Sequence, residues 1–393
     1  MIWSHRVDAD LAVNRLTATL AALRAEGRSI IDLTLSNPTI AGLEYPRGML
    51  AGLADARGLI YRPEAFGLRT AREAVAADYG RRGVSVEAGR IVLTASTSEA
   101  YSLLFKLLCD PGTDILVPRP SYPLLDHLAR LDAVSARFYE LEYQRSWSID
   151  FESVERALSS ETRAIVVVSP NNPTGSRIRQ HELERLDALA AAHGAAVIAD
   201  EVFADYDLAG GNDAASPLRA ESSLVFSLGG LSKSIGLPQA KLAWIAAGGP
   251  PALVAEALAR LEFAADAYLS VSTPVQEAAA ELLRAGSVVR EQIQARIAGN
   301  YRGLVQSVSD ESGCTVLQAD GGWYAVLRVP AIASEEDLVL SLLVGDGVLT
   351  HPGYFFDFQG GAHLVVSLLS PAAAFREGIA RILRHFACTA NGA

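Results

Sequence analysis

Apolar residues recur along the chain in two spacings, which predict an alternation of strands and helices. Short, continuous apolar runs are typical of strands buried on both faces. These runs are Ile91–Thr94, Ile115–Val117, Ala164–Val168, Ala196–Ala199, Leu224–Leu228 and Leu242–Ala246. Segments with helical spacing lie between most of them, among them Ser98–Cys109, Tyr122–Leu131 and Gln180–Ala192. Buried strands joined by helical crossovers predict an α/β fold with a mostly parallel central sheet flanked by helices.

The two ends of the chain have a different pattern. Residues 8–26 have helical spacing that ends at Gly27, and a short strand at Ile30–Leu35 follows. A loop rich in Gly and Pro then leads to a helix predicted at Arg69–Arg82. In the last third of the chain the pattern predicts helices at Pro250–Ala267, Pro274–Asp310 and Ala372–Phe386. Shorter apolar segments lie between them at Trp323–Val329, Asp337–Val344 and His363–Leu368. We therefore expect a smaller α+β domain formed by residues 1–45 and 276–393, beside a large domain at residues 46–275.

Composition excludes several classes of function. The chain has 393 residues, of which 50% are hydrophobic and 20% charged, as in soluble globular proteins. A net charge of −11 argues against a nucleic-acid partner. No apolar run approaches membrane-spanning length, and the N-terminus lacks the apolar core of a signal peptide. Cys109, Cys314 and Cys388 are far apart, which predicts reduced thiols in a cytoplasmic protein and no metal site.

Nucleotide-binding glycine motifs are absent from the sequence, but polar residues follow several predicted strands. Ligands of parallel α/β sheets bind beyond the carboxyl ends of the strands. Ser96, Thr97 and Ser98 follow Ile91–Thr94 and open a helix, so they can form a phosphate cradle or a plain N-cap. Asn172 lies in the turn-forming run Ser169–Gly175, which is either an ordinary loop or a rigid ligand contact.

Three further residues at strand ends are candidates for chemistry. Asp200 closes Ala196–Ala199, where a carboxylate forms a structural ion pair or a functional contact. Lys233 follows a Gly-Gly turn, where burial can lower an amine's pKa and make it a nucleophile, although isolated lysines are usually solvated. Tyr122 can stack on a planar ring or fill the core. Together these groups predict a site for a planar, phosphorylated cofactor that bears an aldehyde.

From about Ile30 to Phe386 the chain resembles the class I/II aminotransferases, the aspartate-aminotransferase-like family of fold-type-I enzymes dependent on pyridoxal 5'-phosphate (PLP). The resemblance rests on N-P-T-G at Asn172–Gly175, D-E at Asp200-Glu201 and S-K at Ser232-Lys233, in this order and spacing. It implies a PLP-binding large domain, an amino acid and a keto acid as substrates, and a homodimer with shared active sites.

The resemblance also implies a role for each matching residue. Lys233 corresponds to the lysine that forms the Schiff base, and Asp200 to the acid that faces the pyridine nitrogen. Asn172 corresponds to the amide that binds the ring hydroxyl, and Tyr122 to the ring that stacks on the cofactor. The residues implied to bind phosphate are Ser96, Thr97 and Ser98, together with Tyr61 acting in the neighbouring subunit.

Four positions depart from the family pattern. Phe203 replaces a tyrosine, so one hydroxyl contact to the cofactor is lost, and Gly230 replaces a serine. Lys241 replaces an arginine and can still supply charge to the phosphate. Val365 stands where the family carries the arginine that binds the substrate α-carboxylate.

Without that arginine, the substrate carboxylate needs another partner. His363, two residues before Val365 on the predicted strand, is one candidate, and the alternative is a histidine at the surface. Asn37 and Asn172 are further candidates for substrate binding, and Arg328 is another possible cation.

The leading functional hypothesis is a PLP-dependent aminotransferase that moves an amino group from an amino acid to a 2-keto acid through Lys233. The alternative is another PLP reaction on the same fold, either β-elimination from a sulfur amino acid or a biosynthetic cyclisation or replacement. A third hypothesis is a non-catalytic PLP-fold protein, such as the effector-binding part of a transcription regulator. No basic DNA-binding module fits ahead of residue 30, which argues against that third hypothesis.

Overall fold

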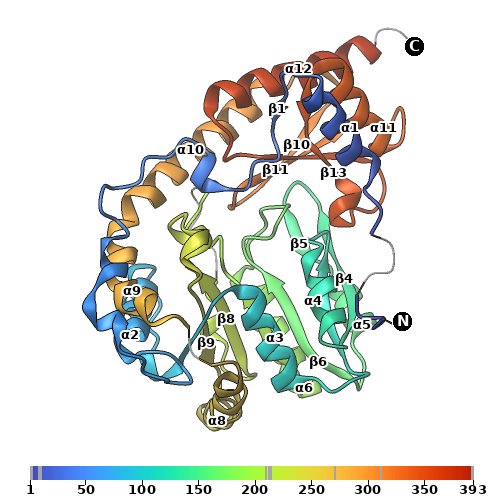
Figure 1. Cartoon of the computed structure of the whole chain (residues 1–393). Helices are drawn as coiled ribbons and strands as arrows, with labels where there is room; N and C mark the ends of the chain where they lie inside the picture. Colours follow the sequence, from blue (N-terminus) through green and yellow to red (C-terminus); the bar gives the residue numbers. More distant parts are fainter. Residues whose placement is uncertain are drawn as a thin grey trace.

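The chain folds into a large lobe, at the bottom of Figure 1, and a small lobe, at the top. The computed structural model describes residues 3–7, 11–208, 210, 215–269, 271–309 and 312–390, and at 388–390 the backbone alone. Within these residues no helix is long and apolar enough to cross a membrane, and no group of side chains suits a metal ion.

The large lobe is built on an eight-stranded sheet, and its five central strands are parallel. The strand β9 runs antiparallel to both of its neighbours, and β5 is an antiparallel edge. In spatial order the strands are β2 (Ile91–Thr94), β9 (Ala243–Gly248), β8 (Val225–Gly230), β7 (Ala196–Asp200), β6 (Thr162–Val168), β3 (Asp114–Arg119), β4 (Ser135–Tyr143) and β5 (Trp147–Ile149).

Helices cover both faces of this sheet. Alternate residues of one strand point to opposite layers: Val166 packs in the layer that contains α3, and Ile165 in the layer that contains α6. This two-sided burial is why the central strands are continuously apolar. The helices of the lobe are α2 (Arg69–Arg81), α3 (Thr97–Leu108), α4 (Leu124–Leu131), α5 (Phe151–Ala157), α6 (Gln180–His193), α7 (Leu231–Ser234), α8 (Pro251–Tyr268) and α9 (Thr273–Ala285).

The small lobe combines segments from both ends of the chain. Its antiparallel sheet has the order β10 (Thr315–Leu317), β11 (Tyr324–Val329), β14 (Ala362–Ser367) and β13 (His351–Pro352). A parallel pair joins β1 (Ile31–Asp32) to β12 (Val348–Leu349), so the N-terminal segment folds back onto the C-terminal part. The helices are α1 (Arg15–Ala25), α10 (Ser287–Ser307), α11 (Glu335–Ser341) and α12 (Ala372–Ala390). This architecture confirms the predicted fold class.

The helix α10 connects the two lobes (Figure 1). Near its start, the buried guanidinium of Arg290 donates a hydrogen bond of 3.0 Å to the carbonyl oxygen of Ser234. The same group forms ion pairs with Asp78 of α2 at 3.1 Å and with Asp205 at 3.5 Å. The first turn of α10 is therefore fixed to the large lobe.

Some elements differ from the predicted ones. The helix predicted over Pro274–Asp310 is divided at Gly286, where a side chain would lie 2.5 Å from Cβ of Ile235. The predicted domain boundary at residue 275 falls inside α9, which packs against α2. The segment Asp337–Val344, for which the sequence predicted no type of element, is helical, formed by α11 and a following π-helical turn, Leu342–Asp346. The strands β4 and β5 were not predicted, because their side chains are largely half-exposed and polar.

Candidate active site

A cavity of about 560 Å³ lies between the lobes, at the carboxyl ends of β6, β7 and β8. The large lobe supplies the predicted residues of its wall, which are Ser96, Thr97, Ser98, Tyr122, Asn172, Asp200, Phe203 and Lys233. The small lobe supplies Tyr324, His351, Phe355 and Phe356, and Ser36 comes from the N-terminal segment. The structure therefore brings together eight side chains that were predicted from separate motifs.

The amine and the carboxylate of the cavity are both partly buried. Lys233 follows β8, and burial lowers the pKa of its amine, while the charge of Asp200 acts in the opposite direction. Burial raises the pKa of Asp200 to about 6, although it accepts hydrogen bonds of 3.1 Å from the hydroxyl of Tyr101 and from the backbone N–H of Val202. A cation beside Asp200 would favour its ionised form.

The neighbours of these two residues have structural functions. Glu201 turns away from the cavity, accepts a hydrogen bond from Ser227 and lies 3.9 Å from the guanidinium of Arg82. Gly229 lies against Trp244, and a Cβ atom at this glycine would be 2.5 Å from the indole nitrogen. The two glycines before Lys233 are thus the end of strand β8 and not the predicted turn, and Gly229 is required by the close packing of β8 against β9.

Two consecutive asparagines differ in their environments. Asn171 is fully engaged, because its amide donates to the carbonyl of Pro120 at 3.0 Å and to the hydroxyl of Thr174 at 2.9 Å, and its Oδ1 accepts from Ser121 at 3.0 Å. Asn172 lines the cavity, and its buried Oδ1 has no hydrogen-bond partner among the described residues. Asn172 is therefore available to a ligand.

The helix α3 points its N-terminus at the cavity. The Ser96 hydroxyl accepts a hydrogen bond of 3.1 Å from the backbone N–H of Glu99. In return, the Glu99 carboxylate accepts a hydrogen bond of 2.5 Å from the backbone N–H of Ala95. This reciprocal cap fixes the first turn, in which the N–H groups of Thr97 and Ser98 have no acceptor within the helix. Such a turn, with hydroxyls beside it, can bind a phosphate.

Four other candidates do not line this cavity. Tyr61, after the 3-10 helix Ala56–Leu59, is 64% exposed. Lys241 is exposed, and Asn37 uses its side chain to cap the 3-10 helix Pro38–Ile40. His363 stacks on Phe358 with ring centroids 4.5 Å apart, and burial, together with the charge of Arg328, lowers its pKa to about 4.

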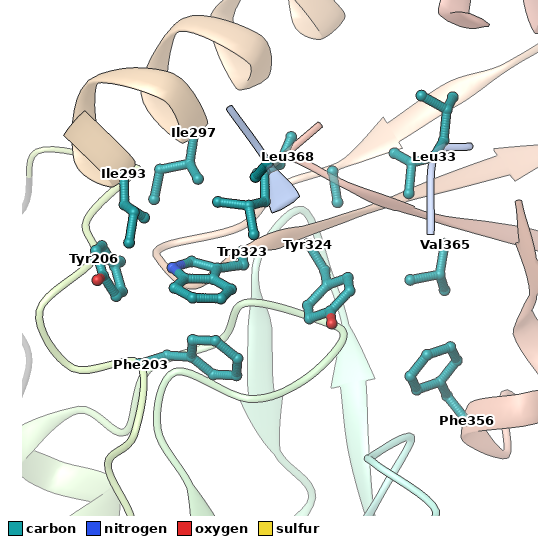
Figure 2. Packing of buried hydrophobic residues seen from close by; sticks show 14 of the residues in the cluster. Leu33, Phe203, Tyr206, Ile293, Ile297, Trp323, Tyr324, Phe356, Val365 and Leu368 are labelled. Carbon is teal, nitrogen blue, oxygen red and sulfur yellow. The ribbon is translucent and has the colours of Figure 1, made fainter. Parts of the chain in front are cut away.

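Several residues of the site were missed in the sequence. Tyr101 lies one helical turn after Ser98 and donates a hydrogen bond to Asp200. Residues three apart lie on the same face of a helix, so this spacing could have indicated that Tyr101 faces the site. Phe203 and Trp323 pack together with ring centroids 5.3 Å apart (Figure 2). The amine of Lys233 lies 5.1 Å from the centre of the Trp323 ring. His351 and Phe356 carried no recognisable motif.

Known proteins support the assignment of the family. The model of the family "Aminotransferase class I and II" matches residues 33–382. A glutamate-pyruvate aminotransferase of Haemophilus influenzae is 25% identical over 92% of both chains. Human tyrosine aminotransferase is 31% identical over 56% of this chain and 49% of its own. An alanine aminotransferase from Pyrococcus furiosus has a TM-score of 0.88 at 24% identity, covering 98% of this chain and 99% of its own.

The family model spans both lobes and every strand end that contributes to the cavity. Members of this family depend in general on PLP and act on amino acids and keto acids. The chain belongs to the class I and II aminotransferases.

Proposed function

We propose that this aminotransferase binds PLP on Lys233 and moves an amino group from an amino acid to a 2-keto acid. The observation that carries the proposal is the meeting, in one cavity, of a partly buried amine, a partly buried carboxylate and an Asn172 oxygen that has no hydrogen-bond partner among the described residues.

The residues fit the cofactor on four counts. Asp200 is a partly buried carboxylate with a raised pKa, which suits a cationic ring nitrogen as its partner. The Asn172 side chain has capacity for a ring hydroxyl. The first turn of α3, with Ser96, Thr97 and Ser98, suits the phosphate. Tyr122 and Phe203 provide aromatic surfaces for a planar ring.

PLP supplies an aldehyde that condenses with amines and a ring that accepts electrons from the substrate Cα. The chain supplies the groups that control protons. Asp200 in its ionised form would hold a proton on the ring nitrogen. Lys233, whose pKa burial lowers, would hold the cofactor through its neutral amine. With substrate in the cavity, the Nζ atom of Lys233 would remove the Cα proton and return it.

We also infer a homodimer in which Tyr61 reaches the phosphate in the neighbouring subunit. Leu59, Ile60 and Tyr61 are consecutive and are 87%, 54% and 64% exposed, as expected of a surface that a second copy covers. Lys241, also exposed, would add positive charge near the phosphate. The free thiols of Cys109 and Cys314 support a cytoplasmic location.

The test is to incubate the purified protein with a panel of amino acids and 2-keto acids. We expect a PLP absorbance that changes with the amino donor, and a new amino acid that appears only when a keto acid is present. Release of ammonia or of a cyclised product without a keto acid would instead favour the alternative PLP reactions.

A further inference from the structure

The small-lobe wall of the cavity carries little charge. It consists of Tyr324 on β11, His351 on β13, and Phe355 and Phe356 on the 3-10 helix Gly353–Phe356. Among the described residues that line the cavity, Lys233 is the one lysine, and none is an arginine. An amino-acid substrate brings a carboxylate into this cavity, and among the described lining residues a side chain other than an arginine is needed to bind it.

Strand register identifies the side chains near Val365. Val365 of β14 is directly opposite Val326 of β11 on one side and His351 of β13 on the other. Side chains of directly opposite residues lie on the same face of a sheet, with Cβ atoms about 5 Å apart. Tyr324, two residues before Val326, points to this face and lines the cavity. Figure 2 shows Val365 above Phe356, which lines the cavity, and on the same side of the small lobe as Tyr324.

His351 reaches the cavity and His363 does not, although register places both on this face. His363 is paired with Arg328, which lies four residues after Tyr324 on β11. Two residues along a strand advance about 6.6 Å, so His363 lies about 13 Å along the sheet from the position of Tyr324. Its ring is covered by Phe358. We therefore leave His363 out of the proposed site.

The ring of His351 has a free hydrogen-bonding edge. It packs at 5.9 Å from the ring centroids of both Phe355 and Phe356, and its nitrogens have no hydrogen-bond partner among the described residues. A neutral imidazole keeps one N–H donor, and a protonated one has two.

Charged and titratable groups around this ring come from several elements. Burial lowers the pKa of His351, and the negative charge of Asp32 on β1 opposes that effect. Asp32 itself lies 3.8 Å from the guanidinium of Arg24. On the helix α11, which packs against β13, the charged group is Glu335. The titratable groups that line the cavity with His351 are Tyr324, Tyr122, Asp200 and Lys233.

We propose that His351 binds the carboxylate of the amino-acid substrate, beside Val365, and that this carboxylate enters the site together with a proton. The inference rests on the proposed aminotransferase function. A carboxylate next to the imidazole favours its charged form, so a ring that is neutral in the free enzyme takes up a proton on binding. An amine that lacks the carboxylate does not stabilise the protonated ring, so its binding should not be coupled to proton uptake by His351.

The experiment uses the PLP-loaded protein and pairs of amines that differ only in the carboxylate. L-phenylalanine is paired with 2-phenylethylamine, and L-leucine with 3-methylbutylamine. Binding is followed through the absorbance of the bound cofactor between about pH 8 and pH 6. The ratio of the two affinities cancels the titration of the substrate amine itself. We expect the ratio to favour the amino acid increasingly as pH falls.

Variants then isolate His351. His351→Asn should weaken binding of the amino acid by about tenfold or more, leave the matched amine unchanged, and remove the pH dependence of the ratio. His351→Asn combined with Val365→Arg should recover amino-acid binding without the pH dependence, because a guanidinium does not titrate in this range. His363→Asn serves as the matched histidine control and should behave like the wild type.

Three results would overturn the inference: equal affinity of the wild type for amino acid and amine, equal weakening of both ligands by His351→Asn, or an unchanged pH dependence in that variant. These results differ from failure of the proposed function. In that case the wild type would carry no PLP, or would transfer no amino group to any keto acid.

Discussion

The large-lobe wall of the cavity and the small-lobe wall are built on different principles. On the large lobe, polar groups stand at the ends of parallel strands, and each is held by packing or hydrogen bonds, as Asp200 is by Tyr101. On the small lobe, aromatic rings surround the imidazole of His351, which has no hydrogen-bond partner in the described part of the chain. The first wall is therefore preorganised for a fixed cofactor, whereas the second adapts its charge to what binds.

The strongest test of the large-lobe wall is removal of its amine. Lys233→Ala should reduce turnover by roughly 10⁴-fold or more, because nucleophile and proton carrier are lost together. The chain has three lysines, Lys106, Lys233 and Lys241, so mass spectrometry after borohydride reduction can locate the PLP adduct unambiguously. We expect the adduct on Lys233 in the wild type and in Lys106→Ala. An adduct on either other lysine would contradict the assignment.

Replacing the carboxylate is the next largest change. Asp200→Asn should lower turnover about a hundredfold, or roughly 3 kcal/mol, while the cofactor is still bound. The amide has the same shape but does not stabilise a proton on the ring nitrogen. Steady-state kinetics with matched cofactor occupancy measures the effect. Turnover close to that of the wild type would show that Asp200 has a structural role only.

A smaller effect tests how the large-lobe wall is tuned. Tyr101→Phe removes the hydroxyl that donates to Asp200, a contact that lowers the pKa of the carboxylate. Its loss should raise that pKa and reduce turnover about fivefold, with the larger reduction at low pH, where Asp200 becomes protonated. The pH profile of kcat/KM would show its acid limb displaced to higher pH. An identical acid limb would break the connection between Tyr101 and Asp200.

The smallest prediction concerns stability of the small lobe. His363 has a pKa near 4 in the folded chain, below the ordinary value of 6.5, because the ring is buried. The unfolded chain therefore binds more protons between these values, and the free energy of unfolding should fall as pH decreases from about 6.5 to 4. His363→Gln should flatten this part of the dependence, as measured by thermal unfolding. Unchanged curves would locate the acid sensitivity elsewhere.

The large-lobe wall was largely predictable from sequence because local features define it. A strand end places Asp200, a Gly-Gly pair at another strand end precedes Lys233, and a Ser-x-x-Glu cap opens α3 at Ser96. Each of these features occupies a few consecutive residues. The fold class followed from the same source, since continuous apolar runs indicate strands buried on both faces.

The small-lobe wall was not predictable in the same way. His351 comes near Val365 only through antiparallel pairing of β13 with β14, and β13 has two residues. A strand this short has no periodicity to read. His363 was a reasonable candidate because it shares a strand and a face with Val365. Two facts that exclude His363 required the structure: its distance along β14 from the cavity, which follows from the strand register, and the stacking of Phe358 on its ring.

The anchor at the start of α10 has a mechanical consequence. Arg290 is held by Asp78, by Asp205 and by the carbonyl of Ser234, the residue next to Lys233. The 21 residues of α10 span about 30 Å and lead from this anchor into the small lobe. Because the start of the helix is fixed, a rotation of the small lobe about it would displace the residues beside Lys233 least and the parts of the small lobe farthest from the anchor most. Opening the cavity to exchange substrates would then leave the reacting centre in register with the sheet.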